Sequence, residues 1–423
     1  MNVSTNTPGE FRRGWAQLIG STVGLGIGVI GLGSYNLGLF AKDLQSAVGL
    51  TKTQYGAGYL AFTLGLAIGL QMWGRLLSRF GAARTAAGSA LALAACFAGM
   101  AAFISTPIAY IVLVGLAGFF GGGTSGLTFT RVISGWFDRS RGFALGLTQV
   151  GLGLCGAILP PIIAMTIARS GWHAGYLMLA AIAAIGAPVS LLILRDNQQD
   201  ISNASNNPEV ADPEALAKEF AAVKRSRTFW LMFVAFTLST LFVAGSAQHM
   251  APMLRELGAT PTSAAKYMSL IGVGTICVRL IVGWLSDHVH APRLMAFSCL
   301  VGMGGVLSLK LGGLAFAPLY AFTVGWAFGG EIDLVAYMCT RYFGLRMFPR
   351  AYAWQYGSLC IAAGVGPLGI GWLADRLGSY QPALVLCAAL AAGAAFTFLL
   401  LPRYDGTAGD AHRQENFGLT STD

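Results

Sequence analysis

The sequence predicts an all-α membrane protein with twelve transmembrane helices arranged in two six-helix lobes. Of its 423 residues 55% are hydrophobic and only 11% are charged, which is too apolar for a soluble protein of this size. Twelve mostly apolar stretches are each about long enough to cross a bilayer. A single long polar segment in the middle of the chain separates six of these stretches from the other six.

The predicted spans follow one another with short polar loops between them. In the first half we expect helices over residues 15–41, 53–75, 82–104, 108–136, 141–168 and 172–194, and in the second half over 228–252, 263–286, 292–312, 316–342, 348–375 and 380–402. The lobes are therefore predicted at 1–194 and 228–402, joined by a linker at 195–227 and followed by a tail at 403–423. The second part of the linker, from Glu214 to Arg227, is predicted to form a short helix at the membrane surface.

The positions of lysine and arginine predict the orientation. If the N-terminus is cytoplasmic, eighteen of the 27 basic residues lie on the cytoplasmic side, seven lie in outer loops and two lie within spans. Because basic loops remain on the cytoplasmic side, we expect a multi-pass protein of the inner (plasma) membrane with both termini in the cytoplasm. The same loop distribution accounts for the net charge of +9 without a nucleic-acid partner.

Several other function classes find no support in the sequence. The seven cysteines fall inside apolar runs without a CxxC pair, so neither a disulfide framework nor a metal site is indicated. No GxxxxGK[ST], HExxH or GxSxG motif is present, and no nucleophile–base pair can be assembled, which argues against ATP-driven pumping and hydrolysis. We therefore expect no enzyme activity and no cofactor. A nutrient sensor on a transporter scaffold would bring an added soluble domain, and the polar tails are short.

One arginine lies in the middle of a predicted span. Arg279 belongs to the span 263–286, where an unpaired arginine facing lipid costs at least about 2.5–3.5 kcal/mol. On helical spacing it shares a stripe with Gly272 and Thr275, opposite a larger apolar face. Arg279 should therefore face protein or a water-filled cavity. Two roles are open: binding an anionic substrate, or a structural ion pair with a carboxylate such as Asp333.

The span 316–342 carries two acidic residues on different sides of one helix. Asp333 shares its face with Trp326 and Tyr337, and this aromatic, hydroxyl-bearing face is the better candidate for a cavity lining. A carboxyl group in such a setting can carry a proton at neutral pH. Asp333 is the first candidate for proton coupling and Glu331 the second. The alternative is that each acid only neutralises an arginine.

Arg131, in the span 108–136, is the other basic residue within a span. It lies close to the predicted cytoplasmic end and could pair with Asp138 in a gate or anchor its helix at the surface. The alternative is a second cation in the central cavity.

Polar and aromatic residues in several spans are further candidates for the transport pathway. His249 precedes Pro252 at the end of its span, where it could titrate with the external pH or simply pack at the helix end. For the aromatic residues the alternative is ordinary packing between helices. The expected substrate-binding residues, besides Arg279, are Tyr35, Asn36, Gln149, Gln248, His249, Thr275, Trp326, Tyr337, Trp354 and Gln355.

Two loop motifs connect these observations with a known family. GRLLSRFGAAR follows the second span and GWLSDHVHAPR follows the eighth. With Gly74, Arg79 and Gly81 in the first motif, the chain resembles the major facilitator superfamily over nearly its full length, although Ser78 stands where an acidic residue is usual. The region from His249 to Asp287, which includes Gly283, is similar to the branch of monocarboxylate porters and oxalate:formate antiporters. WFDRSRGFALG, from Trp136 to Gly146, is also similar to that branch.

The resemblance implies a fold and a function. It implies two lobes of six helices with a central pathway, and Gly74, Arg79, Gly81, Gly283 and Asp287 as residues of the loop motifs. In such porters the arginine of the eighth span binds the substrate carboxylate, and this position is Arg279. Several relatives carry an acidic or amide residue one turn earlier, where this chain has Thr275.

We therefore expect a secondary active transporter that moves small organic carboxylate anions by alternating access, coupled to protons as a symporter. The expected partners are the organic anion, the proton and the lipid bilayer. The alternative is an efflux antiporter for drugs or other metabolites. The span 141–168 lacks the glycine–proline spacing familiar from drug-efflux antiporters, although it contains Pro160 and Pro161.

Overall fold

The chain forms helices joined by short loops. The structure, a computed structural model, describes residues 10–137, 140–195, 213–286 and 289–404, and these contain no strand. The first half contains α1 (Glu10–Gly26), α2 (Val29–Asn36), the 3-10 turn η1 (Leu37–Phe40), α3 (Ala41–Val48), α4 (Lys52–Phe103), α5 (Pro107–Gly121), η2 (Gly122–Thr124), α6 (Gly126–Trp136) and α7 (Arg141–Ile193). The second half contains α9 (Pro213–Arg225), α10 (Arg227–Glu256), α11 (Pro261–Leu285), α12 (Ala291–Gly312), η3 (Gly313–Phe316), α13 (Ala317–Leu377) and α14 (Gln381–Leu399).

Several helices begin at a hydroxyl residue that caps the first turn. The Thr51 side chain accepts a hydrogen bond from the Gln54 backbone N–H, and the Gln54 side chain accepts one from the Thr51 backbone N–H. Thr106, Ser226 and Thr260 cap α5, α10 and α11 through their side-chain oxygens. These oxygens satisfy N–H groups that the first turn of a helix leaves without a partner. The caps therefore fix where the apolar helices start.

Three helices are too long for a single membrane crossing and are broken at a glycine. The helices α4, α7 and α13 have 52, 53 and 61 residues. At the helical rise per residue this is about 80–90 Å, whereas a bilayer core is about 30 Å thick. Gly81, Gly171 and Gly344 interrupt them with φ angles of 79°, 79° and 71°. Glycine adopts these angles without the strain that a Cβ atom would cause.

Nine helical stretches within the described residues are long and apolar enough to cross a membrane. Three of them, Lys52–Phe103, Phe143–Ile193 and Ala291–Gly344, exceed 50 residues, and each contains a glycine with positive φ well inside it. The predicted all-helical class is confirmed. The count of twelve crossings stays a prediction, and the three internal breaks are consistent with it.

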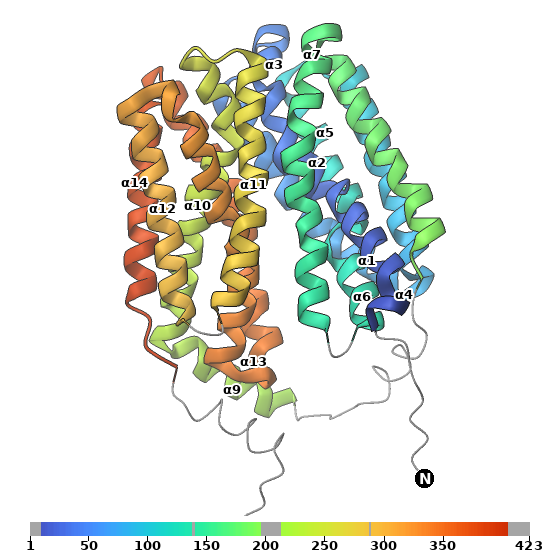
Figure 1. Cartoon of the computed structure of the whole chain (residues 1–423), viewed down its shortest axis with the longest axis vertical. Helices are drawn as coiled ribbons and strands as arrows, with labels where there is room; N and C mark the ends of the chain where they lie inside the picture. The colour runs from blue at the N-terminus through green and yellow to red at the C-terminus, as the bar shows by residue number, and fades with distance from the viewer. Residues whose placement is uncertain (1–9, 138–139, 196–212, 287–288, 405–423) are drawn as a thin grey trace, which may run out of the picture.

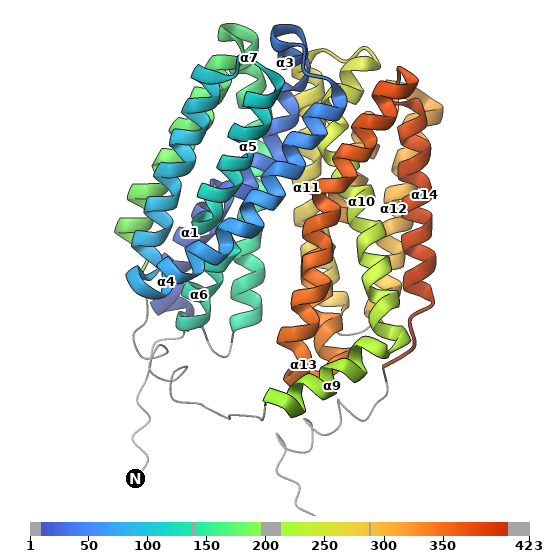
Figure 2. The same cartoon turned by 180° about the vertical axis from the view of Figure 1, so that it is seen from behind.

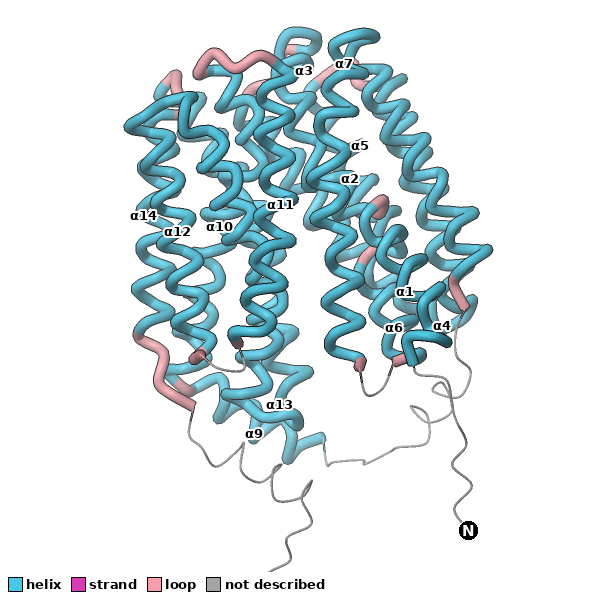
Figure 3. The backbone as a smooth tube through the Cα atoms, in the orientation of Figure 1, coloured by secondary structure: helices cyan, strands magenta, loops and turns pink. Residues whose placement is uncertain are grey.

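The helices gather into two bundles that lie side by side (Figures 1 and 2). Helices α1 to α7 form the first bundle, and α10 to α14 form the second. Helix α9 crosses one end of the second bundle; we call this end of the molecule the α9 end, and the opposite end, where α3 lies, the far end (Figure 3). The helix predicted over residues 214–227 is present as α9. The lobe boundaries stay predictions, and linker residues 196–212 lie outside the described part.

The bundles approach closely where glycine replaces a side chain. A Cβ atom at Gly272 of α11 would lie 2.4 Å from the Gly153 carbonyl oxygen of α7, and one at Gly56 of α4 would lie 2.4 Å from the Pro367 carbonyl oxygen of α13. Such approaches are possible only without a side chain. The ribbons of the two bundles are close at the far end and separate toward the α9 end (Figure 2). The structure is therefore closed at the far end.

Candidate functional site

Arg279 and Asp333 form an ion pair between α11 and α13. The Arg279 Nη1 donates to Asp333 Oδ2 at 3.0 Å. The two partners differ in accessibility, because the Arg279 side chain is 4% exposed and the Asp333 side chain is 44% exposed. The Arg279 Nε is buried and has no hydrogen-bond partner within the described residues. The guanidinium is thus buried in the protein, while its carboxylate partner is accessible to solvent.

This pair is the structural alternative that the sequence left open for Arg279. It also accounts for the tolerance of an arginine inside an apolar helix, because the carboxylate neutralises it. Pairing and substrate binding are compatible when the partner is accessible, since a second carboxylate can then replace the first. The site therefore combines a buried cation, a solvent-accessible acid and a donor atom without a partner among the described residues.

Glu331 lies in a separate polar environment two residues away. Its Oε1 accepts a hydrogen bond from the Ser239 hydroxyl and its Oε2 accepts one from the Thr240 hydroxyl at 3.2 Å, both on α10. Glu331 is 3% exposed. Its described partners are hydroxyl groups, so Glu331 is an acid held by neutral donors. Ser239 and Thr240 are not among the predicted site residues, although they are two adjacent hydroxyl residues in the apolar span 228–252.

An enclosed cavity of about 40 Å³ lies where the two bundles meet, and Glu331 lines it. The first bundle contributes Ser34, Tyr35 and Tyr59, and the second contributes Thr240, Val243, Ala244, Ala247, Gln248, Ile271, Phe328, Glu331 and Ala363. Tyr35, Gln248 and Glu331, which the sequence predicted separately, thus come together. Phe328 and Glu331 share the face of α13 opposite Asp333. The sequence pattern favoured the Asp333 face as the cavity lining, but this cavity is lined by the Glu331 face.

Hydrogen bonds position the polar residues of this central cavity. The Gln248 Nε2 donates to the Ser34 carbonyl oxygen at 2.9 Å, across the two bundles. Gln248 Oε1 is buried without a hydrogen-bond partner among the described residues. Thr275, one turn before Arg279, donates to the Ile271 and Gly325 carbonyl oxygens at 2.9 and 3.1 Å. The Thr275 hydroxyl proton is therefore already used within the protein.

His249 is fully buried next to the cavity and is held on both ring nitrogens. Nε2 contacts the Pro367 carbonyl oxygen at 2.8 Å, and Nδ1 contacts the Tyr380 hydroxyl at 2.9 Å. A carbonyl oxygen only accepts, so Nε2 carries the proton and Nδ1 accepts from Tyr380. This environment is that of a buried, packed side chain, which agrees with the packing alternative; however, α10 continues to Glu256, so His249 lies within the helix and not at its end.

Four other predicted contact residues point their polar groups at neighbouring helices or the backbone. Trp326 Nε1 donates to Ser298 Oγ of α12 at 3.2 Å, and the Tyr337 hydroxyl donates to the Ser286 carbonyl oxygen at 3.1 Å. Gln355 Nε2 donates to the Phe229 carbonyl oxygen, and Asn36 Nδ2 to that of Leu32, both at 3.1 Å. None of the four lines the central cavity.

The last two predicted contact residues lie apart from the central cavity as well. Trp354 is 45% exposed, and the Lys224 ammonium of α9 lies 4.6 Å from the centre of its ring. Gln149 of α7 is partly buried, and its Oε1 has no hydrogen-bond partner within the described part of the chain. Trp354 therefore lies at the α9 end rather than at the level of Arg279.

The predicted gate and loop-motif residues within the described part of the chain lie toward the α9 end. Arg131 Nη1 donates to the Leu77 carbonyl oxygen of α4 at 3.2 Å, near the break at Gly81. Arg79 is exposed, with its guanidinium over the Phe80 ring. Gly74 lies within α4 and Gly283 in the last turn of α11. Asp138 and Asp287 fall outside the described residues, so the proposed Arg131–Asp138 gate stays a prediction.

Polar contacts that were not predicted from the sequence join the bundles at the far end. Lys52 Nζ of α4 pairs with Glu256 Oε2 of α10 at 2.8 Å. The Asp375 carboxylate of α13 accepts hydrogen bonds from the Lys52 and Thr53 backbone N–H groups at 3.1 and 2.7 Å, at the start of α4. Arg255 of α10 pairs with Asp43 of α3 at 3.1 Å. These contacts hold the far end closed. They pair residues from opposite halves of the chain, which a single sequence does not reveal.

Comparison with known proteins identifies the family. Residues 23–332 match the Major Facilitator Superfamily. The chain is 26% identical over 380 residues to the uncharacterized MFS-type transporter YhjX of Escherichia coli, covering 86% of this chain and 88% of that protein. It is 25% identical over 284 residues to human monocarboxylate transporter 12, covering 60% of this chain and 55% of that protein.

A solved structure supports the same fold. The crystal structure of a D-xylose-proton symporter superposes with a TM-score of 0.71 at 15% identity, covering 93% of this chain and 99% of that one. The expected resemblance to the monocarboxylate branch is confirmed by the similarity to monocarboxylate transporters 11 and 12. This chain belongs to the Major Facilitator Superfamily and is a multi-pass membrane protein of a transporter family.

Proposed function

We propose that this protein carries small organic carboxylate anions across the plasma membrane by alternating access, coupled to proton movement. The observation that supports the proposal best is the asymmetric pair of Arg279 and Asp333. The guanidinium is buried, its acidic partner is accessible, and Nε has no partner among the described residues. A substrate carboxylate offers two oxygens to two donors in one plane, which is the geometry that arginine recognises best.

The exchange of carboxylates couples substrate to proton. When a substrate carboxylate takes the place of Asp333 on Arg279, Asp333 loses its cation within a membrane-spanning stretch of the protein. A proton then neutralises it, because an isolated charge there is costly. The loaded carrier holds one cation and one anion, as the empty carrier does. Glu331, held by two hydroxyl groups at the central cavity, is the second candidate for the proton.

Alternating access requires two bundles that close at one end at a time. We propose that the bundles are the lobes 1–194 and 228–402 with twelve crossings, and that the linker 195–227, the tail 403–423 and both termini are cytoplasmic. The α9 end is then cytoplasmic, and the structure represents the inward-facing arrangement. Positive residues in the linker and the short loops support this orientation. The name of human monocarboxylate transporter 12 agrees with the substrate class.

Uptake into proteoliposomes tests the proposal. Labelled carboxylates, from short hydroxy acids to dicarboxylates and aromatic acids, are presented outside purified protein with an external pH dye. We expect at least one acid to accumulate, faster when the outside is acidified, with alkalinisation of the external medium. Extrusion of a drug without uptake of any acid would support the efflux alternative instead. Exchange of acids without any pH change would support the proposed substrate class and contradict the proposed coupling to protons.

A further inference from the structure

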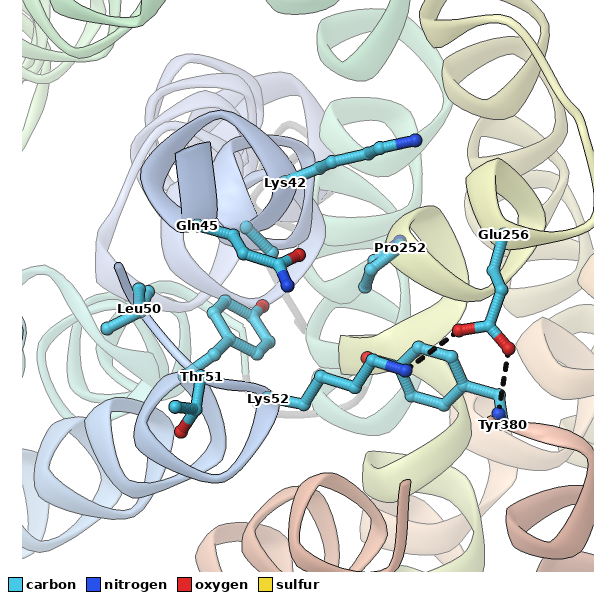
Figure 4. Close-up of a pocket in the computed structure, with 10 residues that line it drawn as sticks. Lys42, Gln45, Leu50, Thr51, Lys52, Pro252, Glu256 and Tyr380 are labelled. Carbon is cyan, nitrogen blue, oxygen red and sulfur yellow. Dashed lines mark hydrogen bonds and ion pairs between the residues drawn. The ribbon is translucent and has the colours of Figure 1, made fainter. Parts of the chain in front are cut away.

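A second cavity lies at the far end of the molecule, remote from the Arg279–Asp333 pair. It has a volume of about 210 Å³ and opens to solvent between the two bundles. We call it the far-end cavity. Figure 4 shows side chains from both bundles pointing into it. Its lining includes Lys42, Gln45, Thr51 and Lys52 of the first bundle and Pro252 and Glu256 of the second.

The charges of this cavity favour an anion. Lys42 and Lys52 face one carboxylate, Glu256, so the lining carries one excess positive charge. The Lys42 side chain is exposed and makes no hydrogen bond or ion pair within the described residues. Gln45 and Thr51 add neutral polar groups, while Leu50 and Pro252 add an apolar wall. A small molecule with one carboxylate and a short apolar body matches this composition.

The ion pair across the cavity is built to be exchanged. Of the two carboxylate oxygens of Glu256, Lys52 Nζ pairs with Oε2, at 2.8 Å. The other oxygen, Oε1, accepts hydrogen bonds from Ser379 Oγ at 3.0 Å and from the Tyr380 backbone N–H at 2.9 Å. If Lys52 leaves, Glu256 therefore keeps two partners within its own bundle. Both side chains are also partly exposed, 18% for Lys52 and 34% for Glu256.

We propose that the far-end cavity is an entry site for small carboxylate anions, in which the anion replaces Glu256 on Lys52 and thereby releases the contact that holds the far end closed. This inference rests on the proposed function, because it takes the carboxylate as the transported class. Lys42 supplies the cation that attracts the anion, and Lys52 supplies the one it binds. The Lys52 ammonium stays over the Tyr380 ring, 4.2 Å from its centre, until the bundles separate.

The experiment measures how fast charged reagents modify a cysteine placed in the cavity of the full-length protein. Gln45→Cys lies in the lining, and Thr262→Cys lies at an exposed position at the start of α11 as its matched control. The probes are a sulfonate-bearing and an ammonium-bearing methanethiosulfonate, with propionate as the competing anion. We expect the anionic probe to react faster at Gln45→Cys by about tenfold relative to the control. Propionate should slow that reaction more than an equal concentration of chloride does.

Adding Lys42→Gln should abolish the preference for the anionic probe and the protection by propionate, whereas Lys310→Gln on α12 should change neither. Equal effects of propionate and chloride, or an unchanged preference in Lys42→Gln, would overturn the proposal.

Spin labels at Ser46 and Thr262, one in each bundle, test the release of the contact between Lys52 and Glu256. Propionate should lengthen that distance in the wild type, and Glu256→Gln should lengthen it without propionate. If neither propionate nor Glu256→Gln changes this distance, the proposal is also contradicted.

These readouts separate the entry site from the proposed function. Protection of Gln45→Cys does not require Arg279, so it should persist in an Arg279→Gln background where uptake is lost. Uptake of acids without any protection of Gln45→Cys by propionate would contradict the entry site and still support the proposed transport function. Protection without uptake of any acid would remove the proposed function and leave an anion site.

Discussion

Arg279 and Asp333 are on different helices and differ tenfold in side-chain exposure, 4% against 44%. The free energy of such a pair is small when one partner is hydrated, up to about 1 kcal/mol. A buried arginine left without any anion would cost more, because nothing would offset the loss of its hydration. The pair therefore keeps Arg279 neutralised while remaining weak enough for a competing carboxylate to displace Asp333.

Asp333→Asn removes the competitor and keeps the size of the side chain. Since up to about 1 kcal/mol of competition is lost, the Kd for a transported acid should fall by up to about fivefold. Turnover should fall as well, because nothing displaces the substrate from Arg279 at release. Isothermal titration and counterflow measure the two quantities. Glu331→Gln is the matched control, and an unchanged Kd in Asp333→Asn would show that Asp333 does not compete with substrate.

The same two variants decide which acid carries the proton. In the exchange mechanism Asp333 is the acid that loses its cation, so uptake by Asp333→Asn should no longer respond to an acidic exterior. Uptake by Glu331→Gln should still rise as the outside is acidified, because the titrating group remains. Initial rates at several external pH values measure this. If the uptake rate stops responding to external pH only in Glu331→Gln, the proton carrier is Glu331 and not Asp333.

At the scale of helices, glycines decide how closely α7 and α11 approach. A Cβ atom at Gly272 would lie 2.3 Å from the Ala157 backbone nitrogen and 2.4 Å from the Gly153 carbonyl oxygen. Gly304 of α12, by contrast, has nothing within 4 Å of such an atom. The two positions therefore form a test and a control on one bundle.

Gly272→Leu should favour the state in which the far end is open. Overpacking costs about 1–3 kcal/mol, which shifts a two-state equilibrium about 5–150-fold. Interbundle distances from spin labels at Ser46 and Thr262 should lengthen in Gly272→Leu and stay unchanged in Gly304→Leu, and the uptake rate should fall only in the first. Equal distances in both variants would mean that contact between α7 and α11 does not control closure.

The sequence predicted the helices better than the faces they present. Apolar runs and glycine breaks located α10 to α12 within a few residues, because burial and backbone geometry act locally. Trp326 and Asp333 share a helical face, yet the first contacts Ser298 of α12 and the second contacts Arg279 of α11. Helix α13 packs against both α11 and α12, so residues of one face meet different partners.

At the scale of the whole molecule, contacts between the halves were beyond reach of the sequence. Gln248 with Ser34, and Lys52 with Glu256, join residues about two hundred positions apart. Periodicity places each residue on its own helix but says nothing about how the bundles dock. The family resemblance supplied the central role expected for Arg279. It did not supply the ion pairs at the far end, which belong to the surfaces of this chain.

The orientation of the whole molecule in the membrane is directly testable. We expect the α9 end in the cytoplasm and the far end outside, because linker and loops at the α9 end carry most of the positive charge. A membrane-impermeant thiol reagent should label Lys42→Cys in intact cells, since that position is exposed at the far end. It should label Ala222→Cys of α9 only after permeabilisation. The opposite pattern would reverse the proposed topology.

The most direct test of the central claim is equilibrium binding of labelled carboxylates to purified wild-type protein and to Arg279→Gln. With Arg279→Lys as a variant that keeps the charge but loses the paired donors, the series separates charge from geometry. We predict that binding at the Arg279 site is abolished in Arg279→Gln, which leaves only the weaker binding at the far-end cavity, and that it is weakened by at least about tenfold in Arg279→Lys, since a bidentate contact contributes more than about 1.4 kcal/mol. Binding of the same acids to Arg279→Gln with unchanged affinity would contradict the account.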